Sequence, residues 1–308
     1  MNQIIDKIIH NMGKVIIGKR FTMEQILIAY LCEGHVLLEG DPGVGKTRLA
    51  LALAKSVEGD FHRVQFTPDI LPSDITGYCV FNKEDNELEY KQGAVFCNIL
   101  LADEINRASP RVQSSLLEAM EERQVTVEGK VRKLPQPFMV VATQNAIEQQ
   151  GTYPLPEAQL DRFFMKLIVG YPSRLEWEKI LDQSETNDAL KELESVATLE
   201  ELILLKKTLE QVEVSKAVKN YIIDIAEAIR RNEMIQTGIS PRGTIALLQA
   251  SKGCALLNGR SYVLPDDVQQ MVLPVLGHRI VLAGHSQWNN MRVESFIRNI
   301  IQSVQVPV

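Results

Sequence analysis

The chain has 308 residues, of which 45% are hydrophobic and 23% charged, and its formal net charge is −6. These values are ordinary for a globular protein with room for two domains, and the acidic balance argues against a dedicated nucleic-acid binder, which usually carries a basic excess. The four cysteines are scattered without a C-x-x-C pair, which argues against a zinc site and favours isolated thiols in a reducing compartment.

The first twenty residues, "MNQIIDKIIHNMGKVIIGKR", carry charges spaced among isoleucines instead of one continuous apolar stretch. This pattern argues against a signal peptide, and the chain has no run of about 18 apolar residues for a membrane span. We therefore expect a cytoplasmic protein. The isoleucine spacing over residues 2 to 12 predicts a helix with one apolar stripe.

Five short apolar or alternating runs then follow, at residues 35–40, 61–67, 98–104, 138–145 and 164–172. Each reads as a strand, and helical patterns such as "GKTRLALALAKSVEG" lie between them. Strands that alternate with helices at this interval predict a parallel sheet covered on both faces, the α/β fold class.

Beyond Pro172 the pattern changes to helices only. Two capping boxes occur, Ser173 with Glu176 and "TLEE" at 198–201, and Ser240 precedes Pro241 as a helix N-cap. We therefore predict an α/β nucleotide-binding core over residues 1–172 and an all-helical lid domain over residues 173–308.

The stretch "GDPGVGKT" (40–47) matches the phosphate-binding loop pattern G-x-x-x-x-G-K-[ST] between a predicted strand and a predicted helix. Its glycines let backbone N–H groups surround phosphates, Lys46 would reach the β- and γ-phosphates, and the Thr47 hydroxyl would bind Mg²⁺. The predicted nucleotide-binding residues here are Gly40, Asp41, Pro42, Gly43, Val44, Gly45, Lys46, Thr47 and Arg48.

Two further strands end in polar residues that suit hydrolysis of a bound nucleotide. "ILLADE" (99–104) delivers Asp103, which would hold Mg²⁺, and Glu104, which would polarise the attacking water. "VVATQN" ends in Asn145, whose amide could orient that water or touch the γ-phosphate. The second acid favours an ATP hydrolase over a kinase, because a kinase acts on a substrate hydroxyl instead of water.

The order of these motifs, continued by "LPEAQLDRF" and "SPR", resembles the AAA+ ATPases and, within them, the MoxR family. "FTPDILPSDITGY", "ADEINRASPRVQSSLLEAMEERQVTV" and "TYPLPEAQLDRF" are close to the pattern of that family. The resemblance runs from "VIIGKR" (15–20) through "SPRG" (240–243), which is most of the chain.

The resemblance implies roles for further residues. Asn145 would be the sensor 1 residue, Ile16, Ile17 and Gly18 would line the adenine pocket, and Arg242 would be the sensor 2 residue of a lid that closes over the nucleotide. Whether Arg242 would act on its own chain's nucleotide or on a neighbour's stays open.

The resemblance also implies that Arg162 is an arginine finger, which reaches the γ-phosphate bound by the adjacent subunit. The alternative is a local salt bridge of Arg162, with Asp161 or Glu157 as partner. Arg107 could also reach phosphate or a neighbouring subunit, and Gln65 could couple a substrate signal to Glu104.

Two segments, 77–93 and 124–135, are predicted as hairpins, the second with Glu128–Gly129 at its turn. Both resemble inserts of the AAA+ clade that includes MoxR proteins and magnesium-chelatase motor subunits. Lys130, Arg132 and Lys133 make the second hairpin basic, but no aromatic stacking residues accompany them, so we rank nucleic-acid binding lower.

We therefore expect an AAA+ ATPase that uses ATP and Mg²⁺ in a homo-oligomeric, hexameric ring. The expected task is chaperone-like remodelling or maturation of a partner protein complex, such as metal or cofactor insertion, with a separate von Willebrand A-domain protein as partner. The alternatives are a metal-chelatase motor subunit, a nucleic-acid translocase of the same clade, and a nucleotide-gated regulator without turnover.

Overall fold

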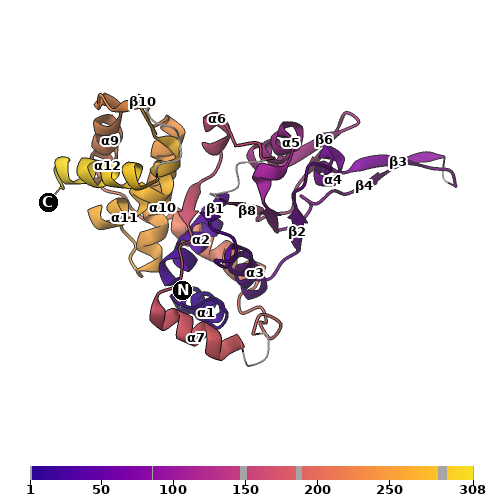
Figure 1. Cartoon of the computed structure of the whole chain (residues 1–308), viewed down its shortest axis with the longest axis horizontal. Helices are drawn as coiled ribbons and strands as arrows, with labels where there is room; N and C mark the ends of the chain where they lie inside the picture. The colour runs from indigo at the N-terminus through magenta and orange to yellow at the C-terminus, as the bar shows by residue number, and fades with distance from the viewer. Residues whose placement is uncertain (1, 85, 146–150, 185–188, 284–289, 308) are drawn as a thin grey trace.

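The computed structural model of the chain describes residues 2–84, 86–145, 151–184, 189–283 and 290–307 (Figure 1). In its first part the helices are α1 (Asn2–Gly13), α2 (Arg20–Leu31), α3 (Lys46–Ser56), α4 (Pro72–Thr76), α5 (Pro110–Glu122) and α6 (Glu157–Leu160), with a 3₁₀ turn η1 (Ile105–Arg107). The predicted amphipathic helix at the N-terminus is therefore confirmed as α1.

A five-stranded sheet forms the centre of this part, in the spatial order β2-β5-β8-β1-β9. Every neighbouring pair is parallel. The strands are β1 (Val36–Gly40), β2 (Phe61–Gln65), β5 (Ile99–Asp103), β8 (Met139–Asn145) and β9 (Met165–Ile168). The five predicted strands and the parallel sheet are confirmed, and β1 runs between β8 and β9, so that its phosphate-binding loop leaves an interior strand of the sheet.

The inner strands β1, β5 and β8 are buried on both faces, and successive residues of one strand enter different hydrophobic clusters. Val36 and Leu38 of β1 belong to the cluster that includes α1, α2 and α3, whereas Leu37 belongs to the cluster that includes α5. A parallel strand covered on both sides is mostly apolar, which is why these inner strands read as nearly continuous apolar runs.

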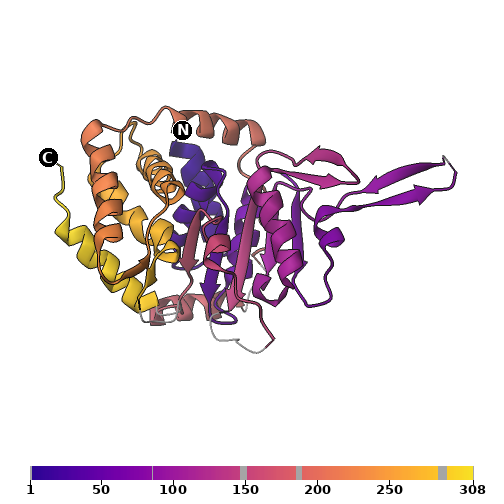
Figure 2. The ribbon, with the colours of Figure 1, turned by 90° about the horizontal axis from the view of Figure 1, so that it is seen from above.

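The two predicted hairpins are confirmed. The first consists of β3 (Tyr78–Asn82) and β4 (Glu87–Lys91) and projects far from the rest of the molecule (Figures 1 and 2). The second consists of β6 (Gln124–Val127) and β7 (Lys130–Lys133), joined by Glu128 and Gly129, both at positive φ as a two-residue hairpin turn requires.

The second part of the chain contains α7 (Arg174–Ser184), α8 (Leu199–Glu210), α9 (Lys216–Arg231), α10 (Pro241–Leu257), α11 (Pro265–Leu276), α12 (Asn290–Ser303) and a 3₁₀ turn η2 (Gly277–Arg279). The prediction of helices alone was wrong in one respect. A small antiparallel sheet joins β10 (Ile235–Thr237) to β11 (Val281–Leu282). Strands of three and two residues are too short to leave a periodic signal in a sequence.

The lid helices share one hydrophobic cluster with α1, α2, α3 and the face of the sheet that these helices cover. Helix α10 packs against α2, and α11 packs against the edge strand β9. The predicted domain boundary at residue 172 stays a prediction, and α7, which follows it, lies against the segment that carries Gly18. Within the ranges that the structure describes, none of the helices has the length and apolar character needed to cross a membrane.

Candidate nucleotide site

The phosphate-binding loop joins the end of β1 to the start of α3. Gly43 and Gly45 have φ values of +81° and +96°, and a Cβ built on either would meet no atom within 4 Å. Glycine is therefore required at both positions by the backbone conformation and not by crowding. The loop leaves the N-terminus of the eleven-residue helix α3 open to an anion, as phosphate binding requires.

Lys46 lies at the centre of a chain of polar contacts. Its ammonium donates to the carbonyl oxygens of Gly40 and Asp41, at 3.1 Å for Asp41, and to Asn145 Oδ1 at 2.8 Å. Burial lowers the pKa of Lys46, and the nearby carboxylates, Asp103 first among them, oppose that shift. A buried ammonium held by loop carbonyls and one amide is positioned for the phosphates of a nucleotide.

Asn145 and Glu104 lie together at the carboxyl ends of neighbouring strands. Asn145 Nδ2 donates to Glu104 Oε1 at 3.3 Å, and Arg107 pairs with Glu104 Oε2 at 3.1 Å. Glu104 follows β5 in the left-handed conformation, with φ of +57°, which a non-glycine residue adopts only when its surroundings enforce it. The Thr143 hydroxyl supplies one constraint, because it accepts from the Glu104 N–H at 2.9 Å.

Thr47 and Asp103, the two residues predicted to bind magnesium, lie in contact with each other. Thr47 Oγ1 donates to Asp103 Oδ2 at 3.1 Å, and the Thr143 hydroxyl donates to Asp103 Oδ1 at 2.7 Å. A hydroxyl and a carboxylate beside a phosphate-binding loop are the donors that Mg²⁺ takes, so the residues fit the ion. Arg63 of β2 also pairs with Asp103, at 2.8 Å.

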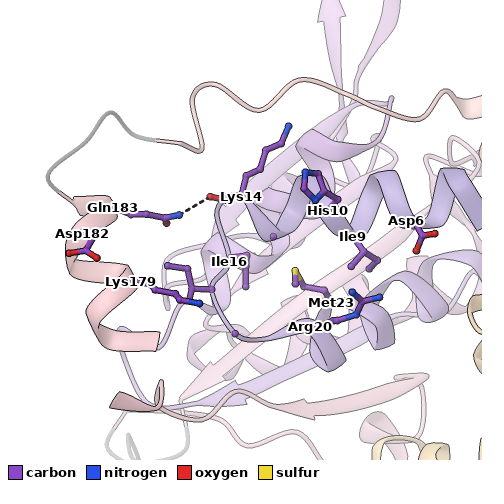
Figure 3. A pocket seen from close by; sticks show the side chains of 13 residues that line it. Asp6, Ile9, His10, Lys14, Ile16, Arg20, Met23, Lys179, Asp182 and Gln183 are labelled. Carbon is purple, nitrogen blue, oxygen red and sulfur yellow. Dashed lines mark hydrogen bonds between the residues drawn. The ribbon is translucent and has the colours of Figure 1, made fainter. Parts of the chain in front are cut away.

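A cavity of about 850 Å³ lies between α1 and α7 (Figure 3). Its lining includes Ile16, Ile17 and Gly18, the residues predicted to bind adenine. Ile16 is buried, Gly18 has a positive φ, and Gln183 of α7 donates to the Lys14 carbonyl oxygen at 3.3 Å. Close to Gly18, Lys19 donates to the carbonyl oxygens of Gly170 and Tyr171. The cavity is therefore closed on one side by the first helix after the sheet.

This segment after β9 also reaches the phosphate-binding loop. The Tyr171 side chain hydrogen-bonds to Asp41, which raises the pKa of the tyrosine. Of the other predicted loop residues, Val44 packs against the hydrophobic cluster, whereas Pro42 and Arg48 are exposed.

Arg162 and Arg242 lie together, away from these contacts. Both pair with Glu121 at the end of α5, Arg162 Nε at 3.0 Å and Arg242 Nη1 at 3.2 Å. The lid arginine is thus paired beside Arg162, and the nucleotide on which Arg242 would act stays a prediction. Among the residues that the structure describes, Arg162 forms its ion pair with Glu121, which its sequence neighbourhood did not offer as a partner.

Sequence reasoning missed four residues of this region: Arg63, Thr143, Tyr171 and Glu121. For two of them the sequence offers a signal of position, because Thr143 precedes Asn145 by two residues and Tyr171 follows β9, the last strand of the main sheet. Gln65 lies opposite Asp103 in the ladder between β2 and β5, and its coupling of a substrate signal to Glu104 stays a prediction.

Comparison with known proteins agrees with this geometry. Residues 35–165 match the model of the ATPase family associated with various cellular activities (AAA), and residues 227–300 match the AAA lid domain. Chaperone MoxR1 of Mycobacterium tuberculosis is 38% identical over 98% of this chain and 82% of its own length. Protein MoxR of Paracoccus denitrificans is 34% identical over 87% of this chain and 86% of its own.

Two further matches extend over the whole chain. Protein YeaC of Bacillus subtilis is 46% identical, and the match covers 96% of its length. A crystal structure of a protein from Cytophaga hutchinsonii superposes with a TM-score of 0.90 at 36% identity, and covers 100% of this chain and 96% of that one. The sheet, the lid and their connection are therefore shared with a solved structure.

Proposed function

Because this chain belongs to the MoxR family of AAA ATPases, we propose that it hydrolyses ATP with Mg²⁺ in a homo-oligomeric, hexameric ring. The chain of contacts from Lys46 through Asn145 to Glu104, next to the Thr47–Asp103 pair, is the observation that supports the proposal most directly. These contacts bring an ammonium, an amide, two carboxylates and a hydroxyl together at one edge of the sheet, the groups that the proposed reaction needs.

Each of these side chains has a task in the proposed reaction. Lys46 neutralises phosphate charge, and Thr47 with Asp103 would hold Mg²⁺, which supplies further positive charge to the phosphates when bound. Glu104 accepts a proton from the attacking water, and Asn145 orients that water because its amide already lies between Lys46 and Glu104.

Arg162 supplies the last charge to the site of the adjacent subunit. Its contact with Glu121 instead of with its own phosphate-binding loop supports this role, as does the neighbouring Arg242, which we assign to the same intersubunit edge. An arginine finger is typically worth about 10³–10⁵ in rate. A contact from one subunit into the next forms a ring when its rotation closes.

We further propose that turnover drives chaperone-like remodelling or maturation of a partner complex, such as metal or cofactor insertion, with a separate von Willebrand A-domain protein as partner. One relative carries the name chaperone MoxR1, which supports the first part of this proposal. A role on nucleic acid receives no support from the second hairpin, because its Arg132 stacks over the Tyr90 ring at 3.8 Å and donates to the Val127 carbonyl oxygen.

The test is ATP turnover as a function of protein concentration, for the unchanged chain, Arg162→Ala, Glu104→Gln and an equal mixture of the two variants. We expect turnover per chain to rise with concentration, each variant to lose at least about 10³-fold, and the mixture to recover activity. Arg231→Ala is the matched control, since Arg231 is an exposed lid arginine that pairs with Glu227 on its own helix. Flat turnover with concentration and an active Arg162→Ala would reject the finger, and Arg107 would be tested next.

A further inference from the structure

A buried arginine of the lid holds the segment that carries Arg162. The side chain of Arg279, in η2, is only 3% exposed, and its Nε pairs with Asp161 Oδ1 at 2.7 Å. Its terminal nitrogens donate to the carbonyl oxygens of Asp161 at 3.0 Å, Phe163 at 2.7 Å and Phe164 at 3.3 Å. The same guanidinium thus binds the residue before Arg162 and the two residues after it.

Two further lid residues contact the same segment. His278 Nε2 donates to the Phe163 carbonyl oxygen at 3.0 Å, and burial holds the pKa of His278 well below its usual range, so the ring stays neutral. The Ser240 hydroxyl, which caps α10, donates to Asp161 Oδ2 at 3.4 Å. Asp161 therefore joins η2 and the start of α10, two residues before Arg242, to the segment that carries Arg162.

The core holds this segment from its other side. The Phe164 N–H donates to the His35 carbonyl oxygen at 2.8 Å, and the Phe163 ring is fully buried in the cluster beneath α5. Arg162 therefore projects from a backbone fixed between lid and core. Since misplacement of a reacting group by about 1 Å can cost 10²-fold in rate, the lid contacts would decide how well Arg162 works.

A comparison within the lid sets Arg279 apart from another arginine that pairs with a carboxylate. Arg260 makes a bidentate pair with the buried Asp267, and both residues belong to the lid. Arg279 has the same chemistry, but its carboxylate and three of its carbonyl partners belong to the segment around Arg162. A buried guanidinium is costly unless its donors are satisfied, so this geometry is strongly specified.

We propose that Arg279 is a positioning residue for Arg162, through which the lid sets the finger that its subunit presents to the next one. This inference rests on the proposed function, because it requires that Arg162 act on a neighbour. It predicts that loss of the Arg279 contacts impairs the finger of a subunit and leaves that subunit's own nucleotide site intact. Movement of the lid would then advance or withdraw the finger.

The test uses the full-length chain and Arg279→Lys, which keeps the charge but cannot bind four acceptors at once. We expect turnover to fall about 10- to 100-fold while a fluorescent ATP analogue binds the variant as tightly as the unchanged chain. Mixed with Glu104→Gln, which supplies normal fingers, Arg279→Lys should regain activity. Mixed with Arg162→Ala, which supplies none, it should stay inactive.

Controls separate this role from a loss of folding and from failure of the ring proposal. Arg260→Lys breaks the matched pair inside the lid and should lower stability without entering this complementation pattern. If Arg279→Lys does not fold, Asp161→Asn tests the same contact from the core side. The inference would be overturned if Arg279→Lys regained activity in both mixtures. It would also be overturned if Arg279→Lys regained activity in neither mixture while Arg162→Ala and Glu104→Gln still complemented each other. If the mixture of Arg162→Ala with Glu104→Gln did not recover activity, the proposal that Arg162 acts on the adjacent subunit would itself be rejected.

Discussion

At the scale of single residues, Glu121 occupies an unusual position, because one carboxylate binds both Arg162 and Arg242. In the proposed ring these two guanidiniums face the phosphates bound by the next subunit. Glu121, which binds both arginines in a single subunit, would compete with those phosphates for them. The three side chains are 31–44% exposed, so each ion pair is worth no more than about 1 kcal/mol.

We therefore expect Glu121→Gln to raise turnover at low protein concentration, by up to about fivefold, which corresponds to about 1 kcal/mol. Turnover measured across a protein dilution series checks this, with Glu122→Gln, the exposed neighbouring acid, as the matched control. A fall in turnover specific to Glu121→Gln would mean that the carboxylate positions the two arginines in the assembled ring.

His35 is a second residue whose chemistry can be tested. Its Nδ1 accepts from the Val140 N–H at 3.0 Å and its Nε2 donates to the Met120 carbonyl oxygen at 3.0 Å. Burial lowers the pKa of His35 from 6.5 to about 4. The unfolded chain therefore binds a proton that the folded chain does not between these values, and stability falls as pH falls through this window.

We expect the free energy of unfolding to drop by roughly 3 kcal/mol between pH 6.5 and pH 4 through His35, with His278 acting in the same direction. Above pH 6.5 this contribution is constant. Denaturant unfolding at several pH values checks the slope, and His35→Gln, which keeps a donor and an acceptor without titrating, should flatten it. An unchanged slope in that variant would assign the pH dependence to other groups.

At the scale of elements, the contact between α10 and α2 decides how the lid is seated. Gly253 of α10 faces Ile28 of α2, and a Cβ on Gly253 would lie 2.6 Å from Ile28 Cγ2. Ile28 is buried and β-branched, so its side chain has little freedom to rotate away. The close approach of the two helices therefore depends on the absence of a side chain.

We expect Gly253→Ala to destabilise the protein by about 1–3 kcal/mol, despite the higher helix propensity of alanine. Gly13→Ala, at the end of α1, is the matched control, because its added Cβ would meet nothing within 4 Å and should be neutral or slightly stabilising. Thermal or denaturant unfolding of both variants gives the comparison. Equal stabilities would show that α2 and α10 can separate without loss.

At the scale of the whole molecule, the hairpin β3–β4 projects from the body and carries a cross-strand apolar pair (Figure 2). Phe81 is 54% exposed and Leu88 is 61% exposed. The base of the hairpin is fixed, since the Tyr90 hydroxyl donates to the Thr76 carbonyl oxygen and Arg132 covers the Tyr90 ring. The exposed pair is thus held away from the core, where another molecule can reach it.

The double variant Phe81→Ser with Leu88→Ser should therefore leave the free energy of unfolding within about 0.5 kcal/mol of the unchanged chain and should keep its basal ATP turnover. Unfolding curves and turnover without any partner check both points. A large loss of stability would mean that these two side chains are already buried in a contact in the absence of a partner.

The sequence by itself determined the fold class, the sheet, both hairpins and the polar residues at the strand ends. These follow from local rules, because an apolar run, a glycine pattern or a capping box acts over a few neighbouring residues. The contacts of Lys46 with Asn145, and of Asn145 with Glu104, could be anticipated for the same reason, since parallel strands bring their carboxyl ends to one edge.

Only the tertiary structure decided which partners the arginines have. Arg162 and Arg242 lie 80 residues apart and meet on Glu121, and Arg279 binds a segment more than 100 residues earlier in the chain. The small sheet of β10 and β11 also forms from segments too short to show a period. Contacts of this kind depend on how the lid packs against α2 and β9, and no local pattern encodes that packing.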